Sequence, residues 1–152
     1  MAVKNAYDVL VALRDQISRD AKVKTYLGRF AKTIGINQAV NEDPTQTPWL
    51  GLYMKRNRMT PDTTARGWNG DLEVTLVAQA HSTKSGDDCV QRLETITQHV
   101  LYAIIQDTTL SGNVEAITDI DISYTATARS EEETFFQVSL IDFVIKVKSH
   151  GR

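Results

Sequence analysis

Residues 86–107 constrain the fold most, because they form an amphipathic pattern between two alternating segments. Apolar residues recur there with the i, i+3, i+4, i+7 spacing of a helix that buries one stripe, at Val90, Leu93, Ile96, Val100 and Ile104. Such a stripe needs an apolar surface to pack on, and alternating strands present one. The sequence therefore predicts a helix from Gly86 to Asp107 that packs against a sheet made by its neighbours.

Two segments beside this helix alternate as half-buried strands do. In residues 71–81 one face is apolar, with Leu72, Val74, Leu76, Ala78 and Ala80. Residues 118–128 alternate strictly, and the core-facing set is Ile120, Ile122, Tyr124, Ala126 and Ala128. We therefore expect both segments to be strands of the same sheet.

Two further segments favour strands but are less regular. Residues 135–148 change phase near their centre, which predicts a β-bulge near Leu140–Asp142 or cover on both faces. Trp49–Lys55 is apolar on both alternating faces, so we expect a short strand covered on both sides.

The first third of the chain begins with a clear helical pattern and then loses it. Residues 4–20 place apolar residues on one side, at Tyr7, Leu10, Val11, Leu13 and Ile17. Residues 21–40 predict a turn and short irregular or strand-like pieces, because Gly28 and Gly35 interrupt the pattern. Residues 41–48 contain two prolines and predict a loop.

Residues 56–69, RNRMTPDTTARGWN, form the longest stretch without a structural pattern. A segment of this length between two strands is usually functional, and here it would project from the sheet as a long hairpin arm. The candidate contact residues on this arm and directly before it are Lys55, Arg56, Arg58, Met59, Arg66 and Trp68. Trp68 fits either an anchor at the base of the arm or a contact residue.

Polar turns and a helix cap separate these elements. Ser85 with Asp88 three residues later resembles a capping box at the start of the central helix. Thr108–Asn113 contains a Ser-Gly-Asn turn that ends this helix, and residues 129–133 form an acidic turn. The elements predict one α+β domain over residues 1–152, in the order α-β-β-α-β-β, with an antiparallel or mixed four-stranded sheet and helices on one face.

Composition is that of a globular chain, with 41% hydrophobic and 24% charged residues. No apolar run approaches the roughly 20 residues that cross a bilayer, and Asp8 interrupts the N-terminal apolar stretch, so we expect no membrane span and no signal peptide. The single Cys89 excludes an internal disulfide and fits synthesis in a reducing cytoplasm.

Charge is uneven along the chain, although the net charge is −2. Residues 1–35 contain seven basic and three acidic residues, a balance of +4, whereas residues 70–134 contain three basic and twelve acidic residues, a balance of −9. Three explanations stay open: a nucleic-acid face, two complementary surfaces that meet in an oligomer, or an ordinary solvated surface.

No residue pattern predicts catalysis, a metal or a cofactor. His81, His99 and His150 lack a partner at ligand spacing, and the glycines form no phosphate-binding pattern. Asp119 and Asp121 share a strand face, but Thr and Ser flank them as on a solvated strand. Cys89 fits a small buried residue in the first turn of the helix. The basic arm has one aromatic residue, which is a weak signal for nucleic-acid binding.

The order of elements resembles the tail terminator, or tail-completion, proteins of long-tailed bacteriophages. The resemblance is carried by residues 70–149: the central helix, the turn TLSGNV at Thr109–Val114, the strand at Ile117–Tyr124, and the closing strand with VSLIDFVIKV. The rest of the chain resembles this family only in size and element order, and residues 21–48 depart from its pattern.

This resemblance implies a non-enzymatic virion protein, made in the host cytoplasm and located at the tail–head junction. It implies a homo-oligomer, a hexameric ring, that caps the tail tube, stops its polymerisation and joins a head-completion or neck protein. DNA would pass through the ring without sequence-specific binding. By analogy, the arm would contact a neighbouring subunit or the tube.

Other hypotheses remain open from the sequence. One is another neck or tail component of the same fold. A second is a small α+β enzyme or ligand-binding protein with a pocket between sheet and helices. A third is a nucleic-acid-binding module that uses the basic arm.

Overall fold

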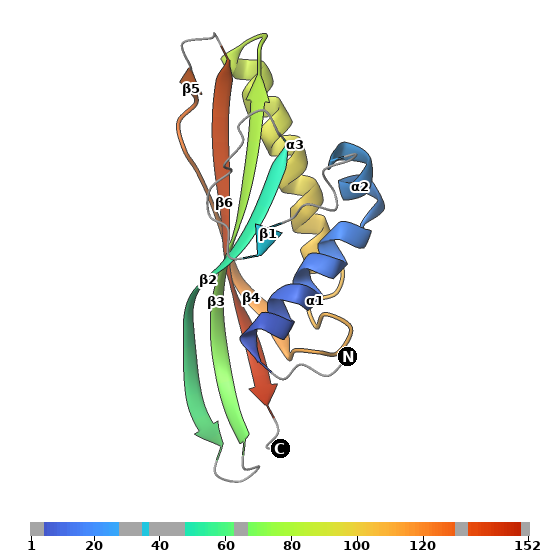
Figure 1. The fold of residues 1–152 in the computed structure, drawn as a ribbon, viewed down its shortest axis with the longest axis vertical. Helices are drawn as coiled ribbons and strands as arrows, with labels where there is room; N and C mark the ends of the chain where they lie inside the picture. The colour runs from blue at the N-terminus through green and yellow to red at the C-terminus, as the bar shows by residue number, and fades with distance from the viewer. Residues whose placement is uncertain (1–4, 28–34, 37–47, 63–66, 130–133, 150–152) are drawn as a thin grey trace.

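The computed structural model describes residues 5–27, 35–36, 48–62, 67–129 and 134–149. Three helices lie on one face of a single sheet (Figure 1): α1 (Ala6–Arg19), α2 (Ala21–Leu27) and α3 (Gly86–Ile105). The strands are β1 (Gly35–Ile36), β2 (Trp49–Asp62), β3 (Gly67–Ser82), β4 (Ala116–Tyr124), β5 (Ala128–Arg129) and β6 (Phe135–Ser149).

The strands are ordered β1-β2-β3-β6-β4, and β5 also pairs with β6. β1 is parallel to β2, and every other pairing is antiparallel. The predicted α+β class is confirmed. The four predicted strands correspond to the four long strands β2, β3, β4 and β6, but the predicted count and order omit α2 and the two-residue strands β1 and β5.

Helix α3 packs its stripe on the sheet as its spacing predicts. Leu93, Ile96, Val100 and Ile104 are all fully buried, and Ser85 accepts a hydrogen bond from the Asp88 backbone N–H at 3.1 Å, so the predicted cap is confirmed. The prediction for Val90 was wrong, because this side chain is 45% exposed. Cys89 takes the buried position instead, and the next residue of a helix points about 100° away.

The strand residues predicted for the core differ in burial. Leu72, Val74 and Leu76 on β3 are buried. Ile120 and Ile122 on β4 are only half-buried and pack against the rim of the core. The core position of β4 belongs to Ile117, which is 6% exposed.

A β-bulge brings both Ile117 and Ile122 onto the face toward the helices, opposite Ile145 and Ile141, and it lies in another strand than predicted. Strand β6 pairs with β3 without a register shift, whereas β4 shifts between Thr118 and Asp121. Asp119 has φ 56° there, a conformation that Asp tolerates better than most residues. Beyond the bulge Tyr124 pairs with the buried Ser139, so it lies on the predicted face toward the helices, and its hydroxyl donates a hydrogen bond to Glu94 of α3 at 2.8 Å. Tyr124 is nevertheless 47% exposed, and Ala126 and Ala128 are also exposed.

Strand β6 alternates regularly once its pairing is known. Its odd-numbered residues from Gln137 to Val147 are buried toward the helices, and two of them, Gln137 and Ser139, are polar. Ser139 shares a 2.8 Å hydrogen bond with Thr97 on α3, which makes a polar residue compatible with full burial. The even-numbered residues on the opposite face are half-buried.

Residues 21–27 form helix α2, so the prediction of irregular or strand-like structure was wrong there. Asp20 caps this helix by accepting hydrogen bonds from the backbone N–H groups of Lys22 and Val23, both at 3.0 Å. Tyr26 donates a hydrogen bond to the Arg92 carbonyl at 2.9 Å, which holds α2 against α3. Of the predicted loop at residues 41–48, residues 41–47 lie outside the described residues.

The turn after α3 is stabilised by hydrogen bonds to the side chain of Asp107. Leu110, Ser111 and Gly112 all have positive φ, and the Asp107 carboxylate accepts hydrogen bonds from the Thr109 hydroxyl and backbone and from the Ser111 backbone. These hydrogen bonds lower the pKa of Asp107, the one from the Thr109 hydroxyl most of all.

Candidate assembly surface

The candidate surface is the arm, which we define as residues 55–62 of β2 and 67–73 of β3. The prediction that residues 56–69 lack structure was wrong for residues 56–62 and 67–69, because β2 and β3 pair there as far as Asp62 and Gly67, and residues 63–66 lie outside the described residues. Pairing with β3 imposes the strand conformation on a polar sequence that has no alternation of its own. Figure 1 shows β2 and β3 running past the helices at their lower end, as a hairpin arm would.

A bulge begins the arm. The pairing shifts between Met54 and Arg56, which leaves Lys55 as the extra residue of β2. After this bulge Arg56 and Arg58 lie on the sheet face away from the helices, opposite Glu73 and Asp71. All of these β2 side chains are exposed to solvent.

The structure describes only part of the other predicted arm residues, Met59, Trp68 and Arg66. Met59 is 52% exposed, and its partner Gly70 puts it on the face toward the helices. The backbone of Trp68 pairs with Pro61 and Ser149, but its side chain lies outside the description. Arg66 also lies outside the described residues. The role of Trp68 as anchor or contact therefore stays a prediction.

Opposite charges are interleaved on the outer face of the sheet, which we define as the face away from the helices. Lys55 approaches Asp142 at 3.6 Å, Arg56 approaches Glu73 at 3.5 Å, and Lys146 approaches Asp71 at 3.4 Å. Asp142 also accepts a hydrogen bond from the Thr75 hydroxyl. These ion pairs are exposed, so each stabilises the fold by at most about 1 kcal/mol.

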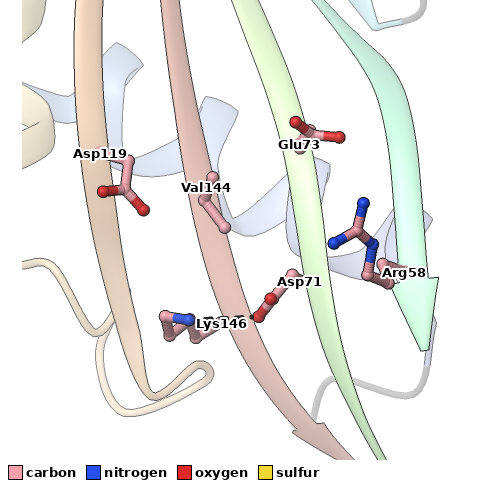
Figure 2. Close-up of a pocket in the computed structure, with 6 residues that line it drawn as sticks. All are labelled: Arg58, Asp71, Glu73, Asp119, Val144 and Lys146. Carbon is pink, nitrogen blue, oxygen red and sulfur yellow. Dashed lines mark hydrogen bonds and ion pairs between the residues drawn. The ribbon is translucent and has the colours of Figure 1, made fainter. Parts of the chain in front are cut away.

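A depression of about 150 Å³ lies among these charges (Figure 2). Four adjacent strands contribute its lining: Arg58, Asp71, Glu73, Asp119, Val144 and Lys146. Figure 2 shows these side chains standing on neighbouring strands of the outer face. Alternating charges on a broad face can recognise a complementary protein surface.

Sequence reasoning missed Asp71, Glu73, Asp142 and Lys146 as members of this surface. A signal for them exists, because on β3 and β6 these residues alternate with apolar core residues. Alternation places them on the outer face, but only the strand order β2-β3-β6 places them beside the basic residues of the arm. Asp119 and Asp121 are exposed, as expected of a solvated strand.

Two side chains outside the arm, Cys89 and His81, belong to residue types that often take part in catalysis. Cys89 is buried as predicted, and its sulfur lies 3.6 Å from the carbonyl oxygens of Ala80 and Phe135. Burial raises the pKa of this thiol, and the charge of Asp88 adds to this. Burial lowers the pKa of His81, and the charge of Arg92 adds to this.

The space between sheet and helices is filled with apolar side chains. Leu10, Leu13, Leu76, Leu93 and Phe143 are all buried at 2% exposure or less. A second depression, of about 460 Å³, lies on the surface of α2 and α3 and is lined by Tyr26, Pro48, Asp88, Gln91, Arg92 and Thr95. Within the described residues, no group of three metal-ligating side chains occurs.

No helix in the described part of the chain is long and apolar enough to span a bilayer.

Comparisons with known proteins show distant structural similarity only. No protein-family model matches the chain, and no curated protein matches it. The chain is similar to a solved structure described as the virion of a native gene transfer agent particle, with 12% sequence identity and a TM-score of 0.43. This similarity covers 91% of this chain and 93% of that chain. Similarity at this level does not identify a family for the chain.

Proposed function

We propose that this chain is a structural virion subunit that forms a homo-oligomeric ring on the end of a tail tube. The ring ends polymerisation of the tube and joins the tail to a head-completion or neck protein. The proposal rests on the resemblance of residues 70–149 to tail terminator proteins. The observation that supports it best is the arm, a paired-strand extension whose outer face alternates in charge.

Such an arm suits assembly better than chemistry. Exposed ion pairs contribute little to the stability of a single chain, but interleaved charges discriminate strongly between right and wrong protein partners. A cyclic ring is built from heterologous contacts, which need two unlike surfaces on each subunit. An extended arm provides one of these surfaces without disturbing the core.

The charge pattern also bears on DNA. Lys55 and Arg56 each lie near a carboxylate of their own sheet, at 3.6 and 3.5 Å. Basic residues that bind DNA strongly neutralise phosphates, and neighbouring carboxylates oppose this. We therefore propose that DNA passes this protein without sequence-specific binding, and that the basic residues of the arm serve protein contacts.

The test is tail assembly in cells that express the tail genes without this chain. We expect over-long tubes that lack heads, and restoration by the wild-type chain. A shortened-arm variant, in which Asn-Gly replaces residues 59–70, leaves Arg58 paired with Asp71 at the end of the hairpin. It should fold, as circular dichroism would show, but fail to restore the tails. Tails of normal length and infectious particles in the absence of the chain would refute the proposed function.

A further inference from the structure

The sheet has two long edges that the described residues leave uncovered. Strand β1 pairs with β2 only at Gly51 and Leu52, so the arm part of β2 has β3 on one side and no described strand on the other. Strand β4 has β6 on one side and likewise no described strand on the other. Uncovered edges present unpaired backbone N–H and C=O groups, which another strand can bind.

These two edges have opposite charge on the same face of the sheet. The β2 edge presents Lys55, Arg56 and Arg58, and the β4 edge presents Asp119 and Asp121. All five residues are exposed. Figure 2 shows Arg58 and Asp119 on the two outer strands of the same region.

The register places the two rows at the same height along the strands. Arg56 pairs with Glu73, which pairs across β3 and β6 with Val144, which in turn pairs with Thr118. Asp119 follows Thr118, and Asp121 pairs with Asp142, whose partner Thr75 pairs with Tyr53 of β2, two residues before Lys55. A second copy set beside the first at this height would therefore bring its acidic row next to the basic row.

Strand direction allows the same arrangement. Each step in the order β2-β3-β6-β4 is antiparallel, so β2 and β4 run in opposite directions. Rotation of a copy about an axis roughly along the strands keeps its helices on the same side of the sheet. The β4 edge of one copy then meets the β2 edge of the next in antiparallel orientation, which is a head-to-tail contact that can close into a ring.

Both edges are interrupted at this height. Lys55 is the extra residue of the β2 bulge, and Asp119 lies in the β4 bulge. Bulges and charges prevent a regular edge from pairing with any strand it meets. They leave the oppositely charged edge of a second copy as the matching partner.

We propose that a second copy of this chain docks with its β4 edge against the β2 arm edge, with Asp119 and Asp121 facing Lys55, Arg56 and Arg58. This inference rests on the proposed ring and specifies how its subunits join. The charges select the partner edge and its register, and the backbone groups of the two edges away from the bulges supply further hydrogen bonds.

The test changes the charge of each edge by substitutions that reverse or remove the charged side chains. The basic-edge variant is Arg56→Glu with Arg58→Glu. The acidic-edge variant is Asp119→Asn with Asp121→Lys, where Asn is chosen because it tolerates the positive φ of Asp119. The control is Lys22→Glu with Lys24→Glu, which reverses two exposed charges on α2. Assembly is measured by light scattering, and folding by urea denaturation.

Each edge variant alone should assemble only at a protein concentration about tenfold or more above that of the wild type, because like charges then meet at every contact. The control should assemble like the wild type. An equimolar mixture of the two edge variants should assemble again, with the two variants in equal numbers, because each contact regains opposite charges. Rescue on mixing would also show that both variants are folded.

The single variants Arg58→Glu and Asp121→Lys repeat the test while leaving the Arg56–Glu73 ion pair intact. Assembly of folded edge variants at wild-type concentrations, or absence of rescue in the mixture, would overturn the edge contact while the ring proposal stands. A wild-type chain that stays monomeric and does not bind tail ends would overturn both.

Discussion

Gln16 ties α1 to the end of α3, and its removal is the sharpest stability test of the helical layer. Its side-chain N–H₂ group lies 2.9 Å from the carbonyl oxygen of Ala103, 3.2 Å from that of Ile104 and 3.0 Å from that of Asp107. The last carbonyl groups of a helix have no partner within the helix. Gln16 therefore serves as a capping group supplied from a segment 87 residues away.

The size of the effect follows from the number of hydrogens. The amide group has two N–H hydrogens for three carbonyl oxygens, so two full hydrogen bonds are present at any time. Each contributes about 0.5–1.5 kcal/mol net, and Gln16→Ala should therefore lower the free energy of unfolding by about 1–3 kcal/mol. Gln16→Glu should lower it further at neutral pH, because a carboxylate cannot donate and would lie at the negative end of the α3 dipole.

The assay is urea unfolding followed by far-ultraviolet circular dichroism. The matched control is Gln98→Ala, since Gln98 also uses its amide group in a hydrogen bond but to Glu94 of its own helix, at 2.8 Å. This i,i+4 pair contributes about 0.2–0.5 kcal/mol, so the control should change little. The reasoning fails if Gln16→Ala unfolds at the same urea concentration as Gln98→Ala.

Three further predictions concern the core, pH and the thiol. Val100→Asp should prevent folding, because it buries a charge without a partner. The control Tyr102→Asp on the same helix should fold, since Tyr102 is 57% exposed. Circular dichroism separates the two outcomes, and a folded Val100→Asp variant would refute the packing of α3. The lowered pKa of Asp107 stabilises the protein above the ordinary Asp pKa, and this contribution is lost as pH falls through the lower folded value. The free energy of unfolding should therefore fall below about pH 4, and less steeply in Asp107→Ala, as urea titrations at each pH would show; equal slopes would contradict this. Cys89 is buried with a raised pKa, so a thiol reagent should label it only after denaturation, and rapid labelling of the native protein would be evidence against its position.

The sequence predicts most closely the elements whose pattern agrees with their surroundings. Leu93, Ile96, Val100 and Ile104 have helical spacing and are buried on the sheet, and Ser85 caps their helix. In these segments local preference and tertiary packing favour the same structure, so the periodicity alone is sufficient.

The elements that sequence reasoning missed depend on partners distant in the chain. Residues 56–62 form a strand because β3 pairs with them, although their own sequence is polar and contains Pro61. Alternation along β4 predicted a core position for Tyr124, and its pairing with Ser139 does place it on the face toward the helices, but it is 47% exposed at the last strand of the order β1-β2-β3-β6-β4. The candidate surface shows the same limit, because Asp71 and Lys146 become neighbours only through strand order.

Ring closure through unlike edges is tested most directly by native mass spectrometry of the wild-type chain over a range of concentrations. Closure predicts one oligomer of fixed size built from the 17.0 kDa chain, a hexamer by resemblance to tail terminators, with few intermediates. A chain that is monomeric at every concentration, or a ladder of oligomers that lengthens as concentration rises, would contradict it.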